Sequence, residues 1–365
     1  MQAATTFGTL LRPAGWLAGL MLVANAHMAQ AEIILTDIAG REVRLDAPAK
    51  RIILEGPAYY PALALLHTDA ADLIIAAGTT KARGEFQAER DLAGKPRLGT
   101  MVSNTFSVER ALELQPDLMI ATLEAPGQQS AVEAAFETAG VPIIYVDFFL
   151  DPVTNTVPSF KLIGQATGAE DRAADYIAFH QTRLDHIRDV IEEADVVAPR
   201  MLVHRQAIDG TCCWSFAQGF MSSFFDMLRI ENIAQDKLPG VVGQLNLEAV
   251  IADDPQVIVA TDMSLTPEAL FRPGRKTDEI ESDLRELTAE PGFAQMSAVR
   301  DGRVHGMDIT LMRSPLNILA VELFAKWAHP DLFADLDPQA TLDQINEQFL
   351  TTPLEPPLWA SLPEE

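Results

Sequence analysis

Two stretches of sixteen residues decide the fold of this chain: SVERALELQPDLMIAT at 107–122 and NLEAVIADDPQVIVAT at 246–261. They align without a gap at a constant offset of 139 positions. Each reads as a polar cap, a short helix, a proline that stops the helix, and a buried strand. A generic helix–strand unit would show the same order of elements, but the shared spacing favours two related lobes. The identical pairs are Glu109 with Glu248, Pro116 with Pro255, Ala121 with Ala260, and Thr122 with Thr261.

Short apolar segments alternate with helical patterns on both sides of these stretches. Strands that are apolar on both faces are typical of a covered parallel sheet. The alternation therefore predicts an α/β architecture. Strands are expected at 51–54, 73–77, 118–121, 143–146, 201–204, 257–260 and 304–307, and helices at 61–66, 108–114, 130–139, 219–228, 247–252 and 314–328.

A long helical pattern lies between the two stretches, at 170–194. Its apolar residues recur at helical spacing, with Gly168 before it and Pro199 after it. A helix of this length would extend about 38 Å. It predicts a stiff connector between two lobes, with limited hinge motion.

Residues 1–31 resemble a secretory signal peptide. Arg12 is followed by an apolar core at 14–24, and the segment ends in Ala29-Gln30-Ala31, a small-x-small cleavage pattern. The alternative is an N-terminal membrane anchor, but the apolar core is short for a span. We expect cleavage before Glu32 and a mature chain that is soluble in a bacterial periplasm.

Composition excludes several classes of protein. The chain of 365 residues has 27 Lys and Arg against 52 Asp and Glu, a formal charge of −25. This balance argues against nucleic acid and anionic lipid as partners. The two Cys cannot form a disulfide scaffold or a Cys-rich zinc module. A secreted enzyme is the competing class. No nucleophile elbow, zincin motif or phosphate loop is found, so no catalytic residue is assigned. An extracytoplasmic sensor module is a third class, which the lack of a retained span disfavours.

An ordered series of motifs runs along nearly the whole mature chain. It comprises DIAGREV at 37–43, PAKRII at 48–53, Glu109 with Pro116-Asp117, AGVPI at 139–143, Gly164 with TGAE at 167–170, GRVH at 302–305 and LFAKWAHP at 323–330. With these motifs the chain resembles the periplasmic substrate-binding proteins of iron–siderophore and cobalamin ABC importers. IENIA at 230–234 departs from the family's Gly-Gly-Asn run because it lacks the glycines.

The resemblance implies two Rossmann-like lobes joined by a single long backbone helix. The expected parts are the signal peptide at 1–31, an N-terminal β-hairpin at 32–47, an N-terminal lobe at 48–157, a connector at 158–195 and a C-terminal lobe at 196–365 with terminal helices. The implied ligand, held between the lobes, is a ferric siderophore, with heme or cobalamin as alternatives. The implied partner is an ABC importer permease. We expect a monomer that is not an enzyme and has no resident cofactor.

The resemblance also implies docking on the permease through one Glu from each lobe, gripped by permease Arg residues. Glu109 and Glu248 match those positions. Carboxylate–Arg pairs are directional, and two separated anchors fix an orientation. The alternative is that each Glu only favours the first turn of its helix through the helix dipole.

Ligand-binding residues are expected on loops that follow strands, facing the gap between the lobes. An anionic ferric siderophore requires cations, for which Arg83, Arg205 and Arg313 are candidates. Trp214 and Phe216 could cover its apolar face. Each Arg could instead be a solvated or salt-bridged surface residue.

Two further loops carry candidate ligand contacts. Tyr59 and Tyr60 are adjacent on a Gly/Pro loop in a chain with only four Tyr, and either stack on a ligand or pack at the rim. Thr100 and Met101 follow Gly99 on a loop after Leu98. In heme-carrying relatives the residue after this Gly is an iron-ligating Tyr, so Thr100 argues against heme held in that way.

Cys212-Cys213 leaves four interpretations open. A catalytic thiol pair is more often spaced Cys-x-x-Cys. A zinc site would need further ligands at suitable spacing. In an oxidising periplasm the pair could form a vicinal disulfide, which we favour, or remain as two buried thiols. The six His of the mature chain form no recognisable ligand cluster, so no metal site is expected.

Overall fold

The fold is taken from a computed structural model. It describes residues 1–4, 8, 32–78, 90–101, 105–123, 130–205, 212–261, 270–271, 274–355 and 357–363. The chain divides into two units, residues 1–31 and residues 32–365. All helices and strands of the described residues lie in residues 32–365. Within the described part of the chain, no helix is long and apolar enough to cross a membrane.

The N-terminal part begins with a hairpin of β1 (Ile33–Thr36) and β2 (Glu42–Leu45), which pair antiparallel. A four-stranded parallel sheet follows in the order β4-β3-β5-β6. Its strands are β3 (Ile52–Leu54), β4 (Ile74–Ala77), β5 (Leu118–Thr122) and β6 (Ile143–Val146). These strands are almost wholly buried, as their apolar sequence predicts. The helices of this part are η1 (Pro57–Tyr59), α1 (Tyr60–Leu66), α2 (Ala70–Leu73), α4 (Val108–Glu113) and α5 (Ser130–Thr138).

The C-terminal sheet is mixed. Its order over the described strands is β10-β8-β7-β11-β12-β13, with β9 beside β7. The parallel centre consists of β7 (Arg200–Arg205), β11 (Val257–Thr261) and β12 (Val304–Met307), as the sequence predicts. The short strands were not predicted, because two or three residues show no periodicity. They are β8 (Trp214–Phe216), β9 (Glu231–Asn232), β10 (Val242–Gln244) and β13 (Trp359–Ser361).

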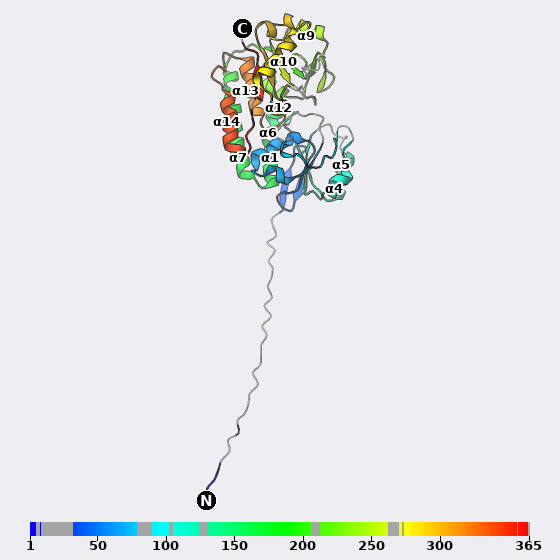
Figure 1. The fold of residues 1–365 in the computed structure, drawn as a ribbon, viewed down its shortest axis with the longest axis vertical. Coiled ribbons are helices and arrows are strands. Elements are labelled where there is room, and N and C mark those ends of the chain that lie inside the picture. The colour runs from blue at the N-terminus through cyan, green and yellow to red at the C-terminus, as the bar shows by residue number, and fades with distance from the viewer. Residues whose placement is uncertain are drawn as a thin grey trace. The chain divides into compact units, whose positions relative to one another are not determined.

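Figure 1 shows the arrangement of the remaining helices. Two predicted helix starts were wrong. The helix expected from 219 begins at Ser222, because Gly219 and Met221 have φ angles of 86° and 54°, outside the helical region. The helix expected from 314 begins at Asn317. The set is α8 (Ser222–Met227), α9 (Leu247–Asp253), α10 (Thr277–Ala289), η2 (Phe293–Gln295), α11 (Ser297–Arg300), α12 (Ile309–Met312), α13 (Asn317–Ala328) and α14 (Pro338–Phe349).

The long connector helix is α7 (Glu170–Glu193), within one residue of its predicted end. A second helix, α6 (Pro152–Thr167), precedes it and packs against it across a turn at Gly168, whose φ is 72°. The expected boundary at 157/158 falls inside α6. On its other side α7 is tied to the C-terminal part, because the Tyr176 hydroxyl donates to the Pro315 carbonyl at 2.7 Å. The connector is therefore braced along its length.

Candidate functional site

Arg205 and Phe216 lie together at the carboxyl end of β7. Arg205 is the last residue of this strand, and β8 brings Phe216 beside it. The Arg205 guanidinium carbon lies 5.9 Å from the centre of the Phe216 ring, at the outer limit of a cation–π contact. Phe216 is buried and Arg205 is half-buried. Trp214 is half-buried and pairs with Arg205 across β7 and β8.

A second arginine reaches the same region through two further rings. Phe220 stacks on Phe216 with ring centres 3.8 Å apart, and Phe149 lies 4.2 Å from Phe220. The Arg313 guanidinium carbon then lies 5.0 Å from the Phe149 ring centre. We call Phe216, Phe220 and Phe149 the aromatic row, which Arg205 and Arg313 flank.

The aromatic row joins the two halves of the molecule. Phe149 follows β6 of the N-terminal sheet, whereas Arg313 directly follows α12, after β12 of the C-terminal sheet. The Met221 amide also donates to the Phe149 carbonyl at 3.3 Å. Among the described residues, the buried Nε of Arg313 meets no hydrogen-bond partner. A buried donor of this kind favours an acceptor that arrives from outside the protein.

Asp147 fixes the loop that carries Phe149. This carboxylate is buried and accepts the backbone amides of Phe149, Leu150 and Asp151 at 2.7–3.0 Å, together with the Asn155 side chain at 2.8 Å. Four donors compensate the cost of burying its charge. The loop is therefore held in one conformation, which places the Phe149 ring against Phe220.

Neither Phe149 nor Phe220 was predicted. Phe149 comes three residues after the end of β6, so the rule that ligand residues follow strands could have found it. Phe220 gave no such signal, because it lies in a turn between β8 and α8. Arg83, by contrast, was predicted and lies outside the described residues.

Tyr59, Tyr60, Thr100 and Met101 are the remaining predicted ligand contacts. Tyr59 and Tyr60 are helical and buried, not exposed on a loop as expected. The Tyr60 hydroxyl donates to Asp91 at 3.0 Å, and burial and the nearby charge of Asp91 raise its pKa. Met101 is buried in the core of the N-terminal sheet, and the Thr100 amide donates to the Thr105 hydroxyl at 3.0 Å. Both Tyr and Met101 are buried in the core, as are Phe216 and Phe220 of the aromatic row.

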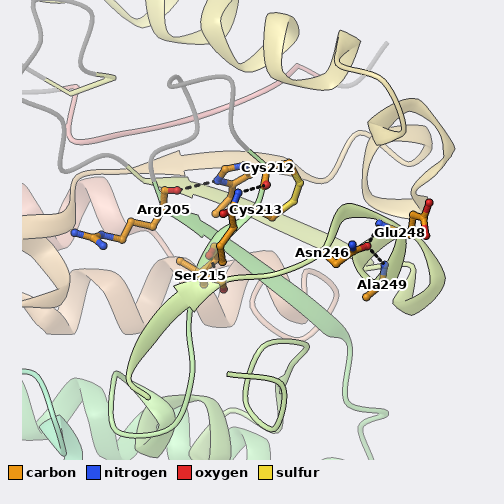
Figure 2. The surroundings of a disulfide bond; sticks show 10 residues. Arg205, Cys212, Cys213, Ser215, Asn246, Glu248 and Ala249 are labelled. Carbon is orange, nitrogen blue, oxygen red and sulfur yellow. Dashed lines mark hydrogen bonds between the residues drawn. A yellow bond between two sulfur atoms is a disulfide. The ribbon is translucent and has the colours of Figure 1, made fainter. Parts of the chain in front are cut away.

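Cys212 and Cys213 are joined by a disulfide just before β8 (Figure 2). Their ligand atoms and an imidazole nitrogen of His204 all lie within 4.8 Å of one another, a group of three that the sequence did not reveal. The His204 Nδ1 lies 3.0 Å from the Arg205 carbonyl oxygen. Burial lowers the pKa of His204 to about 4, so its ring is neutral at physiological pH.

The two predicted docking residues occupy equivalent positions. Glu109 lies in the first turn of α4 and Glu248 in the first turn of α9, and both side chains are exposed. Among the ion pairs formed by described residues, neither Glu takes part. Their exposure is compatible with docking and equally with a dipole effect.

Comparison with known proteins identifies the fold. The sequence model of the periplasmic binding protein family matches residues 62–309. None of the curated protein sequences matches the chain. Among solved structures, the TroA-like periplasmic binding protein FepB from Veillonella parvula is 24% identical, with a TM-score of 0.80 over 91% of this chain and all of that one.

Two other solved structures share the fold at lower identity. The molybdate-binding protein MolA from Haemophilus influenzae is 16% identical, with a TM-score of 0.70 over 89% of this chain and 99% of that one. A periplasmic heme-binding protein from Pseudomonas aeruginosa is 20% identical, with a TM-score of 0.57 over 87% of this chain and 99% of that one. Their different ligands mean that the fold alone does not assign a ligand to this chain.

Proposed function

The chain belongs to the periplasmic binding protein family of ABC importers, and we propose that it captures an anionic ferric siderophore and delivers it to an inner-membrane permease. The observation that carries the ligand class is the aromatic row with Arg205 and Arg313 at its ends. Binding of heme or cobalamin instead is an alternative outcome of the titration described below.

The chemistry of this group suits a large anion with apolar parts. Guanidinium groups bind carboxylate and catecholate oxygens through paired N–H donors and remain charged at any physiological pH. Phe149 is the ring of the aromatic row with exposed surface and would cover the organic framework of such a ligand, while Phe216 and Phe220 are buried behind it. Both arginines belong to the C-terminal part and Phe149 to the N-terminal part, so a ligand that binds Arg313 and Phe149 would contact both halves.

Delivery would use Glu109 and Glu248. Each is exposed at the start of a helix in one of the two related units, so a permease arginine can reach each carboxylate. We propose further that residues 1–31 are removed during export, which leaves a mature chain that starts at Glu32 in the periplasm.

Tryptophan fluorescence tests the ligand class. Trp214 is paired with Arg205 across two strands, so a ligand at the aromatic row should quench it. The purified protein is titrated with ferric complexes of a catecholate, a carboxylate and a hydroxamate siderophore, and with heme and cobalamin. We expect saturable quenching by the anionic ferric complexes, and its loss in Trp214→Phe.

Arginine variants locate the binding. Arg205→Gln and Arg313→Gln should each weaken the anionic complex by roughly tenfold or more, because a hydrogen bond to a charged group contributes about 1.5–3 kcal/mol. Arg285→Gln is the matched control, since this arginine is exposed on α10. The siderophore assignment fails if no ferric complex quenches and heme gives an intense visible band instead.

A further inference from the structure

His204, Cys212 and Cys213 form a compact group at the end of β7. Their ligand atoms lie within 4.8 Å of one another, His204 and Cys213 are buried, and Cys212 is half-exposed. The Arg205 carbonyl can only accept a hydrogen bond, so the contact at 3.0 Å places the ring hydrogen on Nδ1. This leaves Nε2 with the lone pair that a metal requires.

The geometry points to a redox-gated metal site in which reduced Cys212 and Cys213, with His204, bind a thiophilic cation of the zinc class. A dithiol reductant opens the disulfide by exchange: it supplies two electrons and two protons, and is itself oxidised to a disulfide. Binding of one Zn²⁺ by the two thiols then releases two protons to solvent. The oxidised pair offers no thiolate, so it does not bind the metal.

Hydrogen bonds and strand pairing hold the three residues in addition to the S–S bond. The Leu245 amide donates to the Cys213 carbonyl at 2.9 Å, and the Gln244 side chain donates to the Cys212 carbonyl at 2.8 Å. His204 is fixed in β7, where it pairs with Ala260 of β11. Opening the disulfide therefore leaves both cysteines beside the imidazole, which lowers the cost of arranging the ligands.

The donor set selects the class of cation. Zinc binds thiolate sulfur at about 2.3 Å and imidazole nitrogen at about 2.0 Å in a tetrahedral arrangement. Ligand atoms within 4.8 Å of one another are close enough to share one ion once the S–S bond is open. Two sulfurs and a nitrogen do not suit Mg²⁺ or Ca²⁺, which take oxygen ligands. Three protein ligands leave the fourth position to water.

This site is separate from the proposed siderophore contacts. In Figure 2 the Arg205 guanidinium extends away from the cysteine pair, although its backbone contacts His204. The metal site therefore does not depend on which solute binds at the aromatic row.

Zinc competition after reduction tests the proposal. The full chain is reduced, desalted without oxygen, and titrated against a chromophoric zinc chelator, with the oxidised protein in parallel. We expect one equivalent of Zn²⁺ to be withdrawn by the reduced protein and none by the oxidised protein. Co²⁺ in place of zinc should give a thiolate-to-metal charge-transfer absorption, which only sulfur ligation produces.

Substitutions, and one measurement on the wild-type protein, complete the test. Cys212→Ser/Cys213→Ser should abolish binding, and His204→Gln should weaken it at least tenfold. His186→Gln is the matched control, because this histidine is exposed on α7. If the variants fail to fold, protection of the wild-type thiols from alkylation by Zn²⁺ gives the same answer. Reduced protein that retains no more zinc than oxidised protein, or thiols that zinc does not protect, would overturn the proposal.

Discussion

Two helix–strand units can be compared, α4 with β5 and α9 with β11. They share a backbone arrangement, but different side chains stabilise it. In both, the residue directly before the proline that follows the helix has positive φ, Gln115 at 51° and Asp254 at 46°. In both, an arginine that begins or precedes a neighbouring strand, Arg51 or Arg200, donates to carbonyls at the end of the helix. We call this contact the arginine clasp.

The two clasps use the same nitrogen atoms. Arg51 donates from Nε to the Gln115 carbonyl at 2.9 Å and from Nη2 to the Leu114 carbonyl at 2.6 Å. Arg200 donates from Nε to the Asp253 carbonyl at 2.6 Å and from Nη2 to the Asp254 carbonyl at 3.0 Å. A cation at this place also compensates the negative end of the helix dipole.

The helix starts differ. The Asn246 side chain accepts the amides of Glu248 and Ala249, whereas Ser107 makes no capping hydrogen bond. The comparison shows that the helix–proline–strand geometry and the clasp are retained where the cap is not. The C-terminal end of each helix is thus the more constrained part of the unit.

The largest expected effect concerns the exposed Glu of each unit. Glu109→Ala/Glu248→Ala should abolish transport into cells while ligand affinity stays unchanged, because both docking anchors are lost. The single variants show whether the two units contribute equally. Glu113→Ala, an exposed acid on the same helix as Glu109, is the control and should transport normally. Uptake at the wild-type rate by the double variant would refute the docking role.

Removing each clasp tests whether the two units depend on it equally. Arg200→Ala should lower the free energy of unfolding by about 2 kcal/mol, and Arg51→Ala by about 1 kcal/mol, because Arg51 is exposed and water replaces its contacts. Urea denaturation measures both. The corresponding Lys variants should recover little, since Lys lacks the planar fork that reaches two carbonyls. Equal losses at the two positions would contradict this ranking.

The helix caps give a smaller difference. Asn246→Ala should cost about 1 kcal/mol of unfolding free energy, and Ser107→Ala only a few tenths. Ser107→Asn should stabilise the protein, because it adds to the first unit the cap that the second already has. Thermal denaturation of the three variants measures the effect, and a large loss in Ser107→Ala would show that the serine caps in solution.

The smallest effect is a pH dependence of the unfolding free energy, which we expect only for the unit of α9 and β11. The Ser297 hydroxyl and amide donate to the Asp254 carboxylate at 2.7 and 2.6 Å, which lowers its pKa below the ordinary 3.8. A lowered carboxyl pKa contributes stability that is present above 3.8 and is lost as the pH falls through the folded-state value. Asp254→Asn should therefore reduce stability at neutral pH more than in acid. Gln115, at the same place in the α4–β5 unit, has no carboxyl group. The loss of unfolding free energy caused by Gln115→Ala, measured by urea titration, should therefore not vary with pH.

Periodicity predicted the central elements of both sheets. Strands at 118–121, 143–146, 257–260 and 304–307 formed within one residue of their predicted bounds, because buried parallel strands are continuous apolar runs. The long helix was equally clear from its spacing. The three-residue strands β8, β10 and β13 were missed because their pairing depends on partners far along the chain.

The candidate site was predicted only in part. Arg205, Phe216 and Arg313 lie in one group, but the rings that connect them, Phe149 and Phe220, come from separate segments. Tyr59 and Tyr60 were predicted as ligand contacts because Tyr is rare in this chain, but both are buried in the core. A loop position alone does not tell whether a side chain faces a ligand or the interior.

The sequence by itself determined the paired helix–proline–strand units, the connector helix and the family, because these depend on residues close together in the chain. Only the tertiary structure decided that Arg51 and Arg200 clasp the two helices, that Phe149 bridges the arginines, and that His204 lies beside Cys212 and Cys213. Strand order brings these groups together, and strand order is set by burial of the whole sheet. No local pattern of residues encodes it.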